Sequence, residues 1–259
     1  MRSKGNNGVR LLCLCWLMMI VPAAAEIPKT SKAKYGPEAI LLSKSHEYIQ
    51  KSSAPDYWAL SPYYTGQQTE SACSLAALSM ILNAARSNMD LKATDELVTQ
   101  PQLLKRLGDP SYKKKVSTGG DGIDIDHMKT VLERSLRTYG IRDFSVRLVR
   151  TRHTSKTVQE QFHRDLSENE KSGRDFIVAN FIQGILTGDE LVGHYAPIGA
   201  YDAATKRVLI LDPDRQWYEP YWVSEATLLK AAAIFGFRSK TKSSGPKSKS
   251  KEQRAKADG

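Results

Sequence analysis

The apolar residues in the first half of the chain recur at the spacing of helices. The pattern predicts helices over 73–86, about 91–107 and 128–139. The second of these is interrupted at Pro101 and ends at Gly108, because proline breaks the helical hydrogen-bond ladder and glycine favours the conformation that ends a helix. The first half of the chain should therefore be largely helical.

The second half changes to the two-residue alternation of strands. Phe144, Val146 and Leu148 alternate with polar residues and predict a strand. The other predicted elements are a helix over 155–170, strands over 176–182, 193–201 and 207–212, and a last helix over 224–233. Because helices come first and strands later, the order indicates an α+β fold in which the two kinds of element are segregated.

A glycine-rich segment, TGGDGIDID at 118–126, separates two of the predicted helices. Its first residues match a calcium-binding β-helix repeat, but the motif occurs once and has Asp126 where that repeat needs a large aliphatic residue. We therefore expect a turn, in which Asp124 or Asp126 caps the helix that follows.

The first 25 residues have the layout of an export signal. Three basic residues precede a 15-residue apolar run, 11–25, in which Ala23 and Ala25 are placed for cleavage before Glu26. The run is shorter than the roughly 20 residues that span a bilayer. We expect cleavage, no stable membrane insertion afterwards, and a periplasmic or secreted mature protein.

The rest of the chain divides into three parts by composition. Residues 26–60 form a polar N-terminal arm with one helical patch at 37–50, and residues 61–237 form a single domain. Residues 238–259 contain eight lysines and arginines and almost no apolar side chains, which predicts a disordered basic tail. Whether this tail only solvates the protein or holds it to anionic envelope surfaces stays open.

The net charge of +10 lies mostly outside the predicted domain. The first 25 residues carry +3 and residues 238–259 carry +6, which leaves +1 for residues 26–237. A nucleic-acid-binding domain would have its positive charge on the folded surface. The distribution of charge therefore argues against a nucleic-acid partner.

Export leaves one cysteine in the mature chain. Cys13 and Cys15 belong to the signal, so Cys73 has no partner for an internal disulfide. Cys73 begins a predicted helix, where unpaired backbone N–H groups favour the thiolate. Gln67, six residues earlier, is placed to donate a hydrogen bond to an oxyanion beside the sulfur. A buried core cysteine is the alternative interpretation.

A short polar turn joins two of the predicted strands into an antiparallel hairpin. If Tyr201 pairs with Arg207, His194 faces Asp214 and lies diagonal to Asp212 on the same face of the sheet. Asp212 can then accept a proton from one ring nitrogen of His194 and leave the other nitrogen facing a thiol. A register shift of one residue would separate the pair.

Cys73, His194 and Asp212 match a Cys-His-Asp nucleophilic site in residue types and in chain order. A hydrogen-bonded histidine and aspartate without catalysis is the alternative for the hairpin. The other four histidines lack a carboxylate so placed, and the cysteines and histidines do not have metal-ligand spacing. We therefore expect one thiol site and no metal centre.

Around these three residues the chain resembles the phytochelatin synthase family, papain-like enzymes that act on glutathione. The resemblance covers about 61–233 and rests on the Gln67 to Cys73 spacing with the following ALSMILNA, on GHYAPIGAYD and on LDPDRQWYEPYWV. Arg215 and Tyr218 lie three and six residues past the aspartate, as in the family. The resemblance implies a papain-like fold, with a helical N-terminal lobe that carries the nucleophile and an antiparallel C-terminal sheet lobe that carries the histidine and aspartate.

The resemblance also implies a mechanism. The Cys73 thiolate attacks the Cys–Gly carbonyl of glutathione, while His194 acts as base and then acid and is oriented by Asp212. Gln67 and the backbone amide of Cys73 hold the oxyanion. Glycine leaves and a γ-glutamylcysteinyl thioester remains. Water converts it, as the main outcome, to γ-glutamylcysteine, and a second glutathione converts it to a phytochelatin.

The substrate-binding candidates are Arg215 and Tyr218. Arg215 would pair with a substrate carboxylate, and a salt bridge within its turn is the alternative. The flanks of the nucleophile depart from the family, because Ala72 and Ser74 stand where an aromatic residue and a glycine are usual. Substrate packing should differ at these two positions.

No cofactor is required by this mechanism. We expect a short form without the Cys-rich C-terminal domain of the plant enzymes and with weak or no metal sensing, so that cadmium or zinc enters only as a metal–glutathione thiolate substrate. Glutathione is the expected small-molecule partner, and a homodimer stays open. The alternative functions are a papain-like peptidase with another peptide substrate and a non-catalytic envelope protein that binds thiol peptides or metal.

Overall fold

The structure, a computed structural model, describes residues 32–150 and 153–238. The chain divides into two units, Met1–Lys32 and Ala33–Gly259, and every described helix and strand belongs to the second. The predicted export signal at 1–25 lies outside the described residues, as does the predicted basic tail except for its first residue.

Five strands form one antiparallel sheet, in the order β1-β5-β4-β3-β2. The strands are β1 (Ile40–Leu41), β2 (Val178–Ile182), β3 (Gly193–Asp202), β4 (Arg207–Ile210) and β5 (Tyr221–Ser224). The α-helices of the described residues are α1 (Glu47–Lys51), α2 (Pro55–Leu60), α3 (Cys73–Arg86), α4 (Gln100–Leu107), α5 (Pro110–Lys115), α6 (Ile125–Thr138), α7 (Lys156–Asn169), α8 (Gln183–Leu186) and α9 (Glu225–Arg238). Two short 3-10 turns, η1 (Leu42–Lys44) and η2 (Ser61–Tyr63), complete the described elements.

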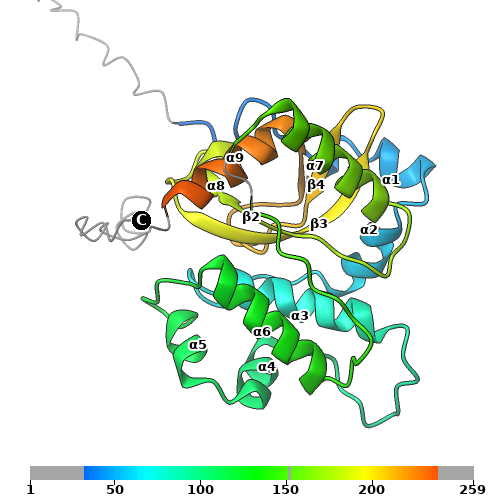
Figure 1. Cartoon of the computed structure of the whole chain (residues 1–259), viewed down its shortest axis with the longest axis vertical. Coiled ribbons are helices and arrows are strands. Elements are labelled where there is room, and N and C mark those ends of the chain that lie inside the picture. Colours follow the sequence, from blue (N-terminus) through cyan, green and yellow to red (C-terminus); the bar gives the residue numbers. More distant parts are fainter. Residues whose placement is uncertain (1–31, 151–152, 239–259) are drawn as a thin grey trace, which may run out of the picture. The chain divides into compact units, whose positions relative to one another are not determined.

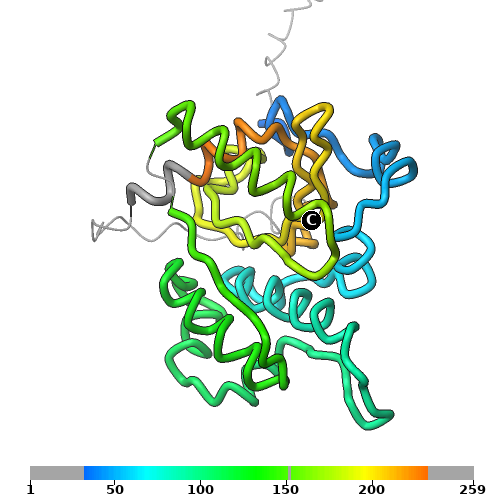
Figure 2. Tube along the Cα trace, turned by 45° about the vertical axis from the view of Figure 1, so that its right-hand side comes forward, coloured from blue at the N-terminus to red at the C-terminus, as the bar shows by residue number. Residues whose placement is uncertain are grey.

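Helices cover both faces of the sheet, as Figures 1 and 2 show. On one face, α7 and α9 pack on an apolar cluster that includes Ile198 and Ile210. On the other face, α3 packs against Leu209 and its neighbours through Met80 and Ile81. Helices α4, α5 and α6 gather around α3 in a third cluster (Figure 1). The chain therefore has the predicted α+β fold, with the strands late in the sequence except for β1.

The predicted helices at 73–86 and 128–139 are confirmed as α3 and α6. On α6, Met128, Val131 and Leu136 form the buried face. Of the two expected caps Asp124 is the correct one, because its carboxylate accepts a hydrogen bond of 2.8 Å from the backbone N–H of His127.

The helix predicted over 91–107 is wrong in its first half. Helix α4 begins only at Gln100, so Pro101 lies in its first turn rather than interrupting it. Thr99 and Gln102 form a reciprocal capping box at this end, and Gly108 ends the helix in the left-handed conformation as expected. The capping residues at 99–102 decide where the helix begins, whereas the apolar spacing had placed its start near residue 91.

The strand predicted at 144–148 does not form. Phe144, Val146 and Leu148 are half-buried and their intervening neighbours are exposed, so the alternation itself is real. No described strand pairs with this segment, and Phe144 and Val146 pack against the helical cluster around α3 instead. An alternating pattern reports one buried face, whereas a strand also needs a partner for its backbone groups.

The hairpin of β3 and β4 forms, with a register that differs from the prediction at its turn. Tyr201 pairs with Val208, one residue beyond the predicted partner. The pairing then shifts at Gly199, an extra residue on β3, and Ile198 pairs with Ile210. This bulge compensates the initial offset, so the predicted register is restored at Ile198, where the pairing with β4 ends. His194 itself pairs with Phe181 of β2.

Residues 33–60, expected as a polar arm, contribute to the fold. The segment predicted as a helical patch at 37–50 contains strand β1, which pairs with β5, followed by η1 and the start of α1. Tyr35 forms an isolated antiparallel bridge with Thr187. Backbone pairing with a strand far away in the sequence decides the conformation here, which no local pattern reveals.

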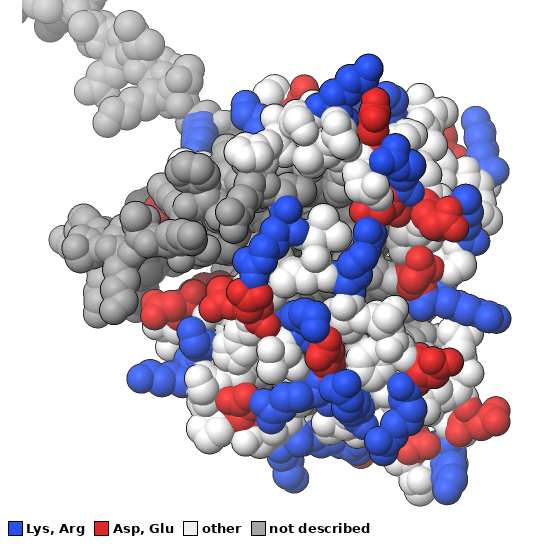
Figure 3. Space-filling model, viewed as in Figure 1, with Lys and Arg blue, Asp and Glu red and all other residues white. Residues whose placement is uncertain are grey.

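The surface is mixed in charge. Figure 3 shows basic and acidic side chains interspersed over the face in view, in keeping with the near-neutral composition of residues 26–237. None of the helices in the described ranges is both long and apolar enough to cross a membrane.

Candidate active site

Cys73 is the first residue of α3 and is buried. The residue before it, Ala72, offers no side-chain cap, and the first turn contains no acidic residue. The N–H groups of this turn therefore keep their positive potential for a sulfur or an oxyanion that lies close to them.

The loop that leads into Cys73 is held by the glycine-rich segment. Thr69 Oγ1 donates to the carbonyl of Val116 at 2.7 Å, and Ser71 Oγ donates to the carbonyl of Gly120. The backbone N–H of Gly119 donates to Glu70 at 2.6 Å. The predicted turn at 118–126 thus supports the backbone that presents the nucleophile.

His194 and Asp212 form a buried hydrogen bond in the predicted sense. The distance from His194 Nε2 to Asp212 Oδ1 is 2.7 Å, and the two side chains are 5% and 0% exposed. Nδ1 is left as the ring nitrogen for a thiol, and Cys73 lies close enough to His194 to raise the pKa of the imidazole. The Phe181 ring meets the imidazole edge-on at 5.6 Å and shields it. The structure therefore brings Cys73, His194 and Asp212 together.

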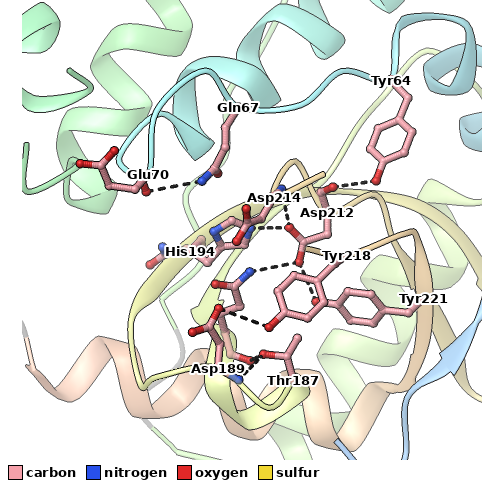
Figure 4. Close-up of polar contacts among 12 residues, drawn as sticks. Tyr64, Gln67, Glu70, Thr187, Asp189, His194, Asp212, Asp214, Tyr218 and Tyr221 are labelled. Carbon is pink, nitrogen blue, oxygen red and sulfur yellow. Dashed lines mark hydrogen bonds and ion pairs between the residues drawn. The ribbon is translucent and has the colours of Figure 1, made fainter. Parts of the chain in front are cut away.

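Asp212 accepts hydrogen bonds on both carboxylate oxygens (Figure 4). Besides His194, the backbone N–H of Asp214 donates to Oδ1 at 2.9 Å. Tyr221 donates to Oδ2 at 2.8 Å, and Gln183 makes a longer contact of 3.5 Å with the same oxygen. A buried carboxylate with this many donors is fixed in orientation and stays ionised.

The electrostatics of the pair favour opposite charges. Burial by itself raises the pKa of Asp212, but the charge and hydrogen bond of His194, with the donors of Asp214 and Tyr221, lower that pKa below its usual value. Burial disfavours the imidazolium, but Asp212, followed by Cys73, raises the pKa of His194 well above its usual value. The imidazole of His194 can therefore keep a proton while the Asp212 carboxylate stays ionised.

Gln67 lies at the predicted place on the loop before the nucleophile (Figure 4). Its backbone N–H donates to the carbonyl of Pro213 at 2.7 Å, which ties the loop to the segment after Asp212. Its amide nitrogen makes only a long contact of 3.5 Å with the carbonyl of Glu70, and its Oε1 is buried with no partner among the described residues. The side-chain amide is thus weakly held and can reorient toward a bound substrate.

The two substrate-binding candidates lie in different settings. The Arg215 guanidinium is exposed and stacks on the Tyr64 ring at 4.6 Å. Tyr218 is buried, and its hydroxyl donates to Asp189 at 3.2 Å. Arg215 is therefore available at the surface next to the site, whereas Tyr218 lies within the protein.

Three residues that the sequence analysis missed contact Asp212: Tyr64, through the backbone carbonyl at 2.6 Å, and Gln183 and Tyr221, through the side chain. Tyr221 reaches Asp212 because β5, a strand that the sequence pattern did not predict, pairs with β4 and places this tyrosine opposite Ile210. No periodicity distinguishes the other two from ordinary loop and helix residues.

Ser74, one of the two residues beside the nucleophile that differ from the family pattern, has a buried contact. The Ser74 hydroxyl lies 3.3 Å from the Tyr112 hydroxyl, and both side chains are buried. Ser74 thereby joins the start of α3 to α5.

Another histidine has a carboxylate partner, contrary to expectation. His163 Nδ1 lies 3.1 Å from Glu225 Oε2, where α7 meets the start of α9. This pair is distant in sequence, so spacing alone did not indicate it. The described residues contain no group of three or more metal-ligating side chains that could hold an ion.

Comparison with known proteins places these features in context. A family model described as phytochelatin synthase matches residues 32–243. Glutathione gamma-glutamylcysteinyltransferase 1 of Arabidopsis thaliana is 24% identical over 190 residues, which cover 72% of this chain and 35% of that protein. Glutathione gamma-glutamylcysteinyltransferase 3 of Lotus japonicus is 27% identical over 177 residues, 68% of this chain and 34% of that protein. The chain thus spans about a third of the length of these relatives.

Proposed function

This chain belongs to the phytochelatin synthase family, and we propose that it is a thiol acyltransferase that removes glycine from glutathione through a γ-glutamylcysteinyl thioester on Cys73. The observation that carries the proposal is the buried His194–Asp212 hydrogen bond of 2.7 Å, together with Cys73 at the helix start, close enough to His194 to raise the pKa of the imidazole. The names of the relatives supply the substrate class.

The first step is attack by sulfur. His194 takes the thiol proton, and the thiolate adds to the carbonyl carbon of the Cys–Gly bond of glutathione. The negative charge on the carbonyl oxygen is stabilised by the Cys73 backbone N–H and, after reorientation, by the Gln67 amide. The tetrahedral species collapses as the imidazolium gives its proton to the departing glycine nitrogen, which leaves the thioester and free glycine.

The second step resolves the thioester. Water that loses a proton to His194 releases γ-glutamylcysteine and restores the Cys73 thiol, whereas the amino group of a second glutathione gives a phytochelatin. We propose hydrolysis as the main outcome. The ratio of the two products as glutathione concentration rises measures the partition, because only transpeptidation depends on a second substrate molecule.

A papain-like arrangement accounts for this chemistry, with the nucleophile on a helix and the base and its orienter on an antiparallel sheet. Arg215 is the proposed partner for a substrate carboxylate, because its guanidinium is exposed beside Tyr64. We also propose that the enzyme acts after export and takes cadmium or zinc only as glutathione thiolates.

Mass spectrometry of the intact protein after exposure to glutathione tests the proposal. Wild type should gain a γ-glutamylcysteinyl group on Cys73 and release glycine, and Cys73→Ser should do neither. A folded wild-type protein that leaves glutathione unmodified would contradict the proposal.

A different peptide substrate is the second candidate, and Ser74 favours it because a serine in contact with Tyr112 stands after the nucleophile where the family usually has glycine. An adduct of another mass on Cys73 would identify such a peptidase. A Cys73 that reacts with iodoacetamide no faster than free cysteine at neutral pH would indicate a non-catalytic binding protein instead.

A further inference from the structure

Tyr221 reaches the Asp212 side chain from β5. Its ring is fully buried, and its hydroxyl donates to Oδ2 of Asp212 at 2.8 Å. The other contact of that oxygen among the described residues, from Gln183, is 3.5 Å long. Tyr221 is therefore the principal donor to the carboxylate oxygen that does not bind His194.

The ring of Tyr221 is held from several sides. Tyr35 packs edge-on against it at 5.6 Å, and Tyr218 does so at 6.4 Å. Its backbone pairs with Ile210 of β4, two residues before Asp212. The position of the hydroxyl is thus determined by the sheet and by two further tyrosines, and it does not depend on the Asp212 contact alone.

A donor on Oδ2 has two physical effects on the pair. It restricts the Asp212 carboxylate to one orientation, in which Oδ1 points toward His194 Nε2. It also delocalises the negative charge toward Oδ2, so that the pull of the carboxylate on the imidazole proton is moderated. A base that must both accept and return a proton needs this moderation, because an imidazolium held too strongly cannot protonate the leaving amine.

We propose that Tyr221 is a positioning residue for the thiol site, whose hydroxyl orients Asp212 and limits its charge so that His194 is aligned and can still release its proton. The proposal rests on the proposed function only for the identity of the reaction. The effect on the Cys73–His194 pair is independent of the substrate.

The titratable and charged groups around the Asp212 carboxylate come from several elements, and any change of pH dependence must be compared against them. They are Tyr35, Tyr64, His194, Asp214 and Tyr221, with Arg215 next to Tyr35 and Tyr64, Tyr218 next to Tyr221, and Cys73 next to His194.

Tyr221→Phe tests the proposal with the ring volume kept. The rate of Cys73 alkylation by iodoacetamide is measured against pH, which reports the ionisation of the thiol and its imidazole without any substrate. In wild type we expect two inflections, the upper one from loss of the imidazolium proton. Tyr221→Phe should move the upper inflection to higher pH by about one unit, because the unmoderated carboxylate holds the imidazolium more strongly.

Glutathione turnover gives the second readout. Tyr221→Phe should lower kcat about tenfold, as loss of an outer hydrogen bond to a catalytic group commonly does, with KM little changed. Gln183→Leu should move the alkylation profile less than Tyr221→Phe, because its contact with Oδ2 is longer.

Tyr201→Phe is the matched control. Tyr201 is equally buried, and its hydroxyl donates to Glu225, which also binds a histidine. Its loss should leave the alkylation profile of Cys73 unmoved. An unchanged profile in folded Tyr221→Phe, an equal shift in Tyr201→Phe, or a larger shift in Gln183→Leu would overturn the proposal. If wild type leaves glutathione intact while the alkylation profiles differ as expected, the proposed function fails and the role of Tyr221 stands.

Discussion

Two histidine–carboxylate pairs in this chain share their local chemistry and differ in their surroundings. In the inner pair His194 bonds Asp212 at 2.7 Å, and in the outer pair His163 bonds Glu225 at 3.1 Å. A tyrosine hydroxyl donates to the carboxylate in each pair. The arrangement of histidine, carboxylate and tyrosine therefore occurs twice.

The inner and outer pairs differ in how deeply they are buried. The side chains of the inner pair are 5% and 0% exposed, whereas those of the outer pair are 38% and 15% exposed. Water screens the outer pair and weakens its electrostatic effect on neighbouring groups. The inner pair also has the Cys73 thiol against its imidazole. A histidine bound to a carboxylate is thus a common stabilising contact, and burial beside a nucleophile is what distinguishes a candidate site.

Replacing each histidine gives the most direct test of this comparison. His194→Ala should reduce glutathione turnover by about 10⁴-fold, because the thiol loses its base and the leaving amine its acid. His163→Ala should leave turnover within about threefold of wild type, since its pair is solvated. Both rates are measured by glycine release on folded protein. Comparable losses in the two variants would contradict the distinction.

Gln67, on the loop before Cys73, is the proposed side-chain donor to the oxyanion. Gln67→Ala should lower kcat by about 10²- to 10³-fold, the cost of removing one oxyanion donor, with little change in stability because its amide makes only a long contact. Gln68→Ala is the matched control, an exposed neighbour on the same loop. Steady-state kinetics with glutathione separates kcat from KM, and an effect confined to KM would remove Gln67 from the oxyanion site.

The strand that carries His194 has a bulge at Gly199, and we expect the position of Asp212 to depend on it. A Cβ at Gly199 would lie 2.7 Å from Cγ of Leu211, the residue before Asp212. Gly199→Val should therefore cost about 2 kcal/mol of folding stability by overpacking and lower kcat at least about tenfold by displacing Asp212. Adding Leu211→Ala should recover part of the kcat loss by making room. Urea unfolding and turnover measure the two effects, and unchanged turnover in Gly199→Val would show that the bulge is not required.

Asp56 on α2 shows how a buried carboxylate behaves without a histidine. Neither oxygen has a partner among the described residues, and burial, then Glu170 and Asp175, raise the pKa to about 9 against a weaker opposing interaction with Asn169. The folded state keeps a proton that the unfolded chain loses, so this group makes stability fall as pH rises from about 4 to about 9.

Asp56→Asn should remove that dependence. The free energy of unfolding of the variant, relative to that of wild type, should rise by about 1 kcal/mol for each pH unit between about pH 6 and pH 8. Urea unfolding measures it. A constant difference between the two proteins across this range would mean that Asp56 is ionised in the folded state, as Asp212 is.

The pattern of the sequence predicted the elements that depend on local interactions. Helix α3 begins at Cys73 and α6 is capped by Asp124 as expected, because helix spacing and capping act within a few residues. The strand expected at 144–148 was wrong because pairing needs a partner from elsewhere. The helical patch at 37–50 was wrong in its first part for the converse reason, since β1 has such a partner in β5, whereas η1 and the start of α1 are helical.

For the site, the sequence by itself determined the nucleophile's place at a helix start and the chain order of Cys73, His194 and Asp212. Both follow directly from residue types and from spacing over a few residues. The sequence also indicated that His194 and Asp212 could meet, and the tertiary structure decided the register: pairing is offset by one residue at the turn and shifts back at the bulge at Gly199. It also decided that Tyr221 donates to Asp212, whereas His163 binds Glu225 at a partly exposed position. These outcomes depend on register and enclosure, which arise from contacts between distant segments and have no local signature.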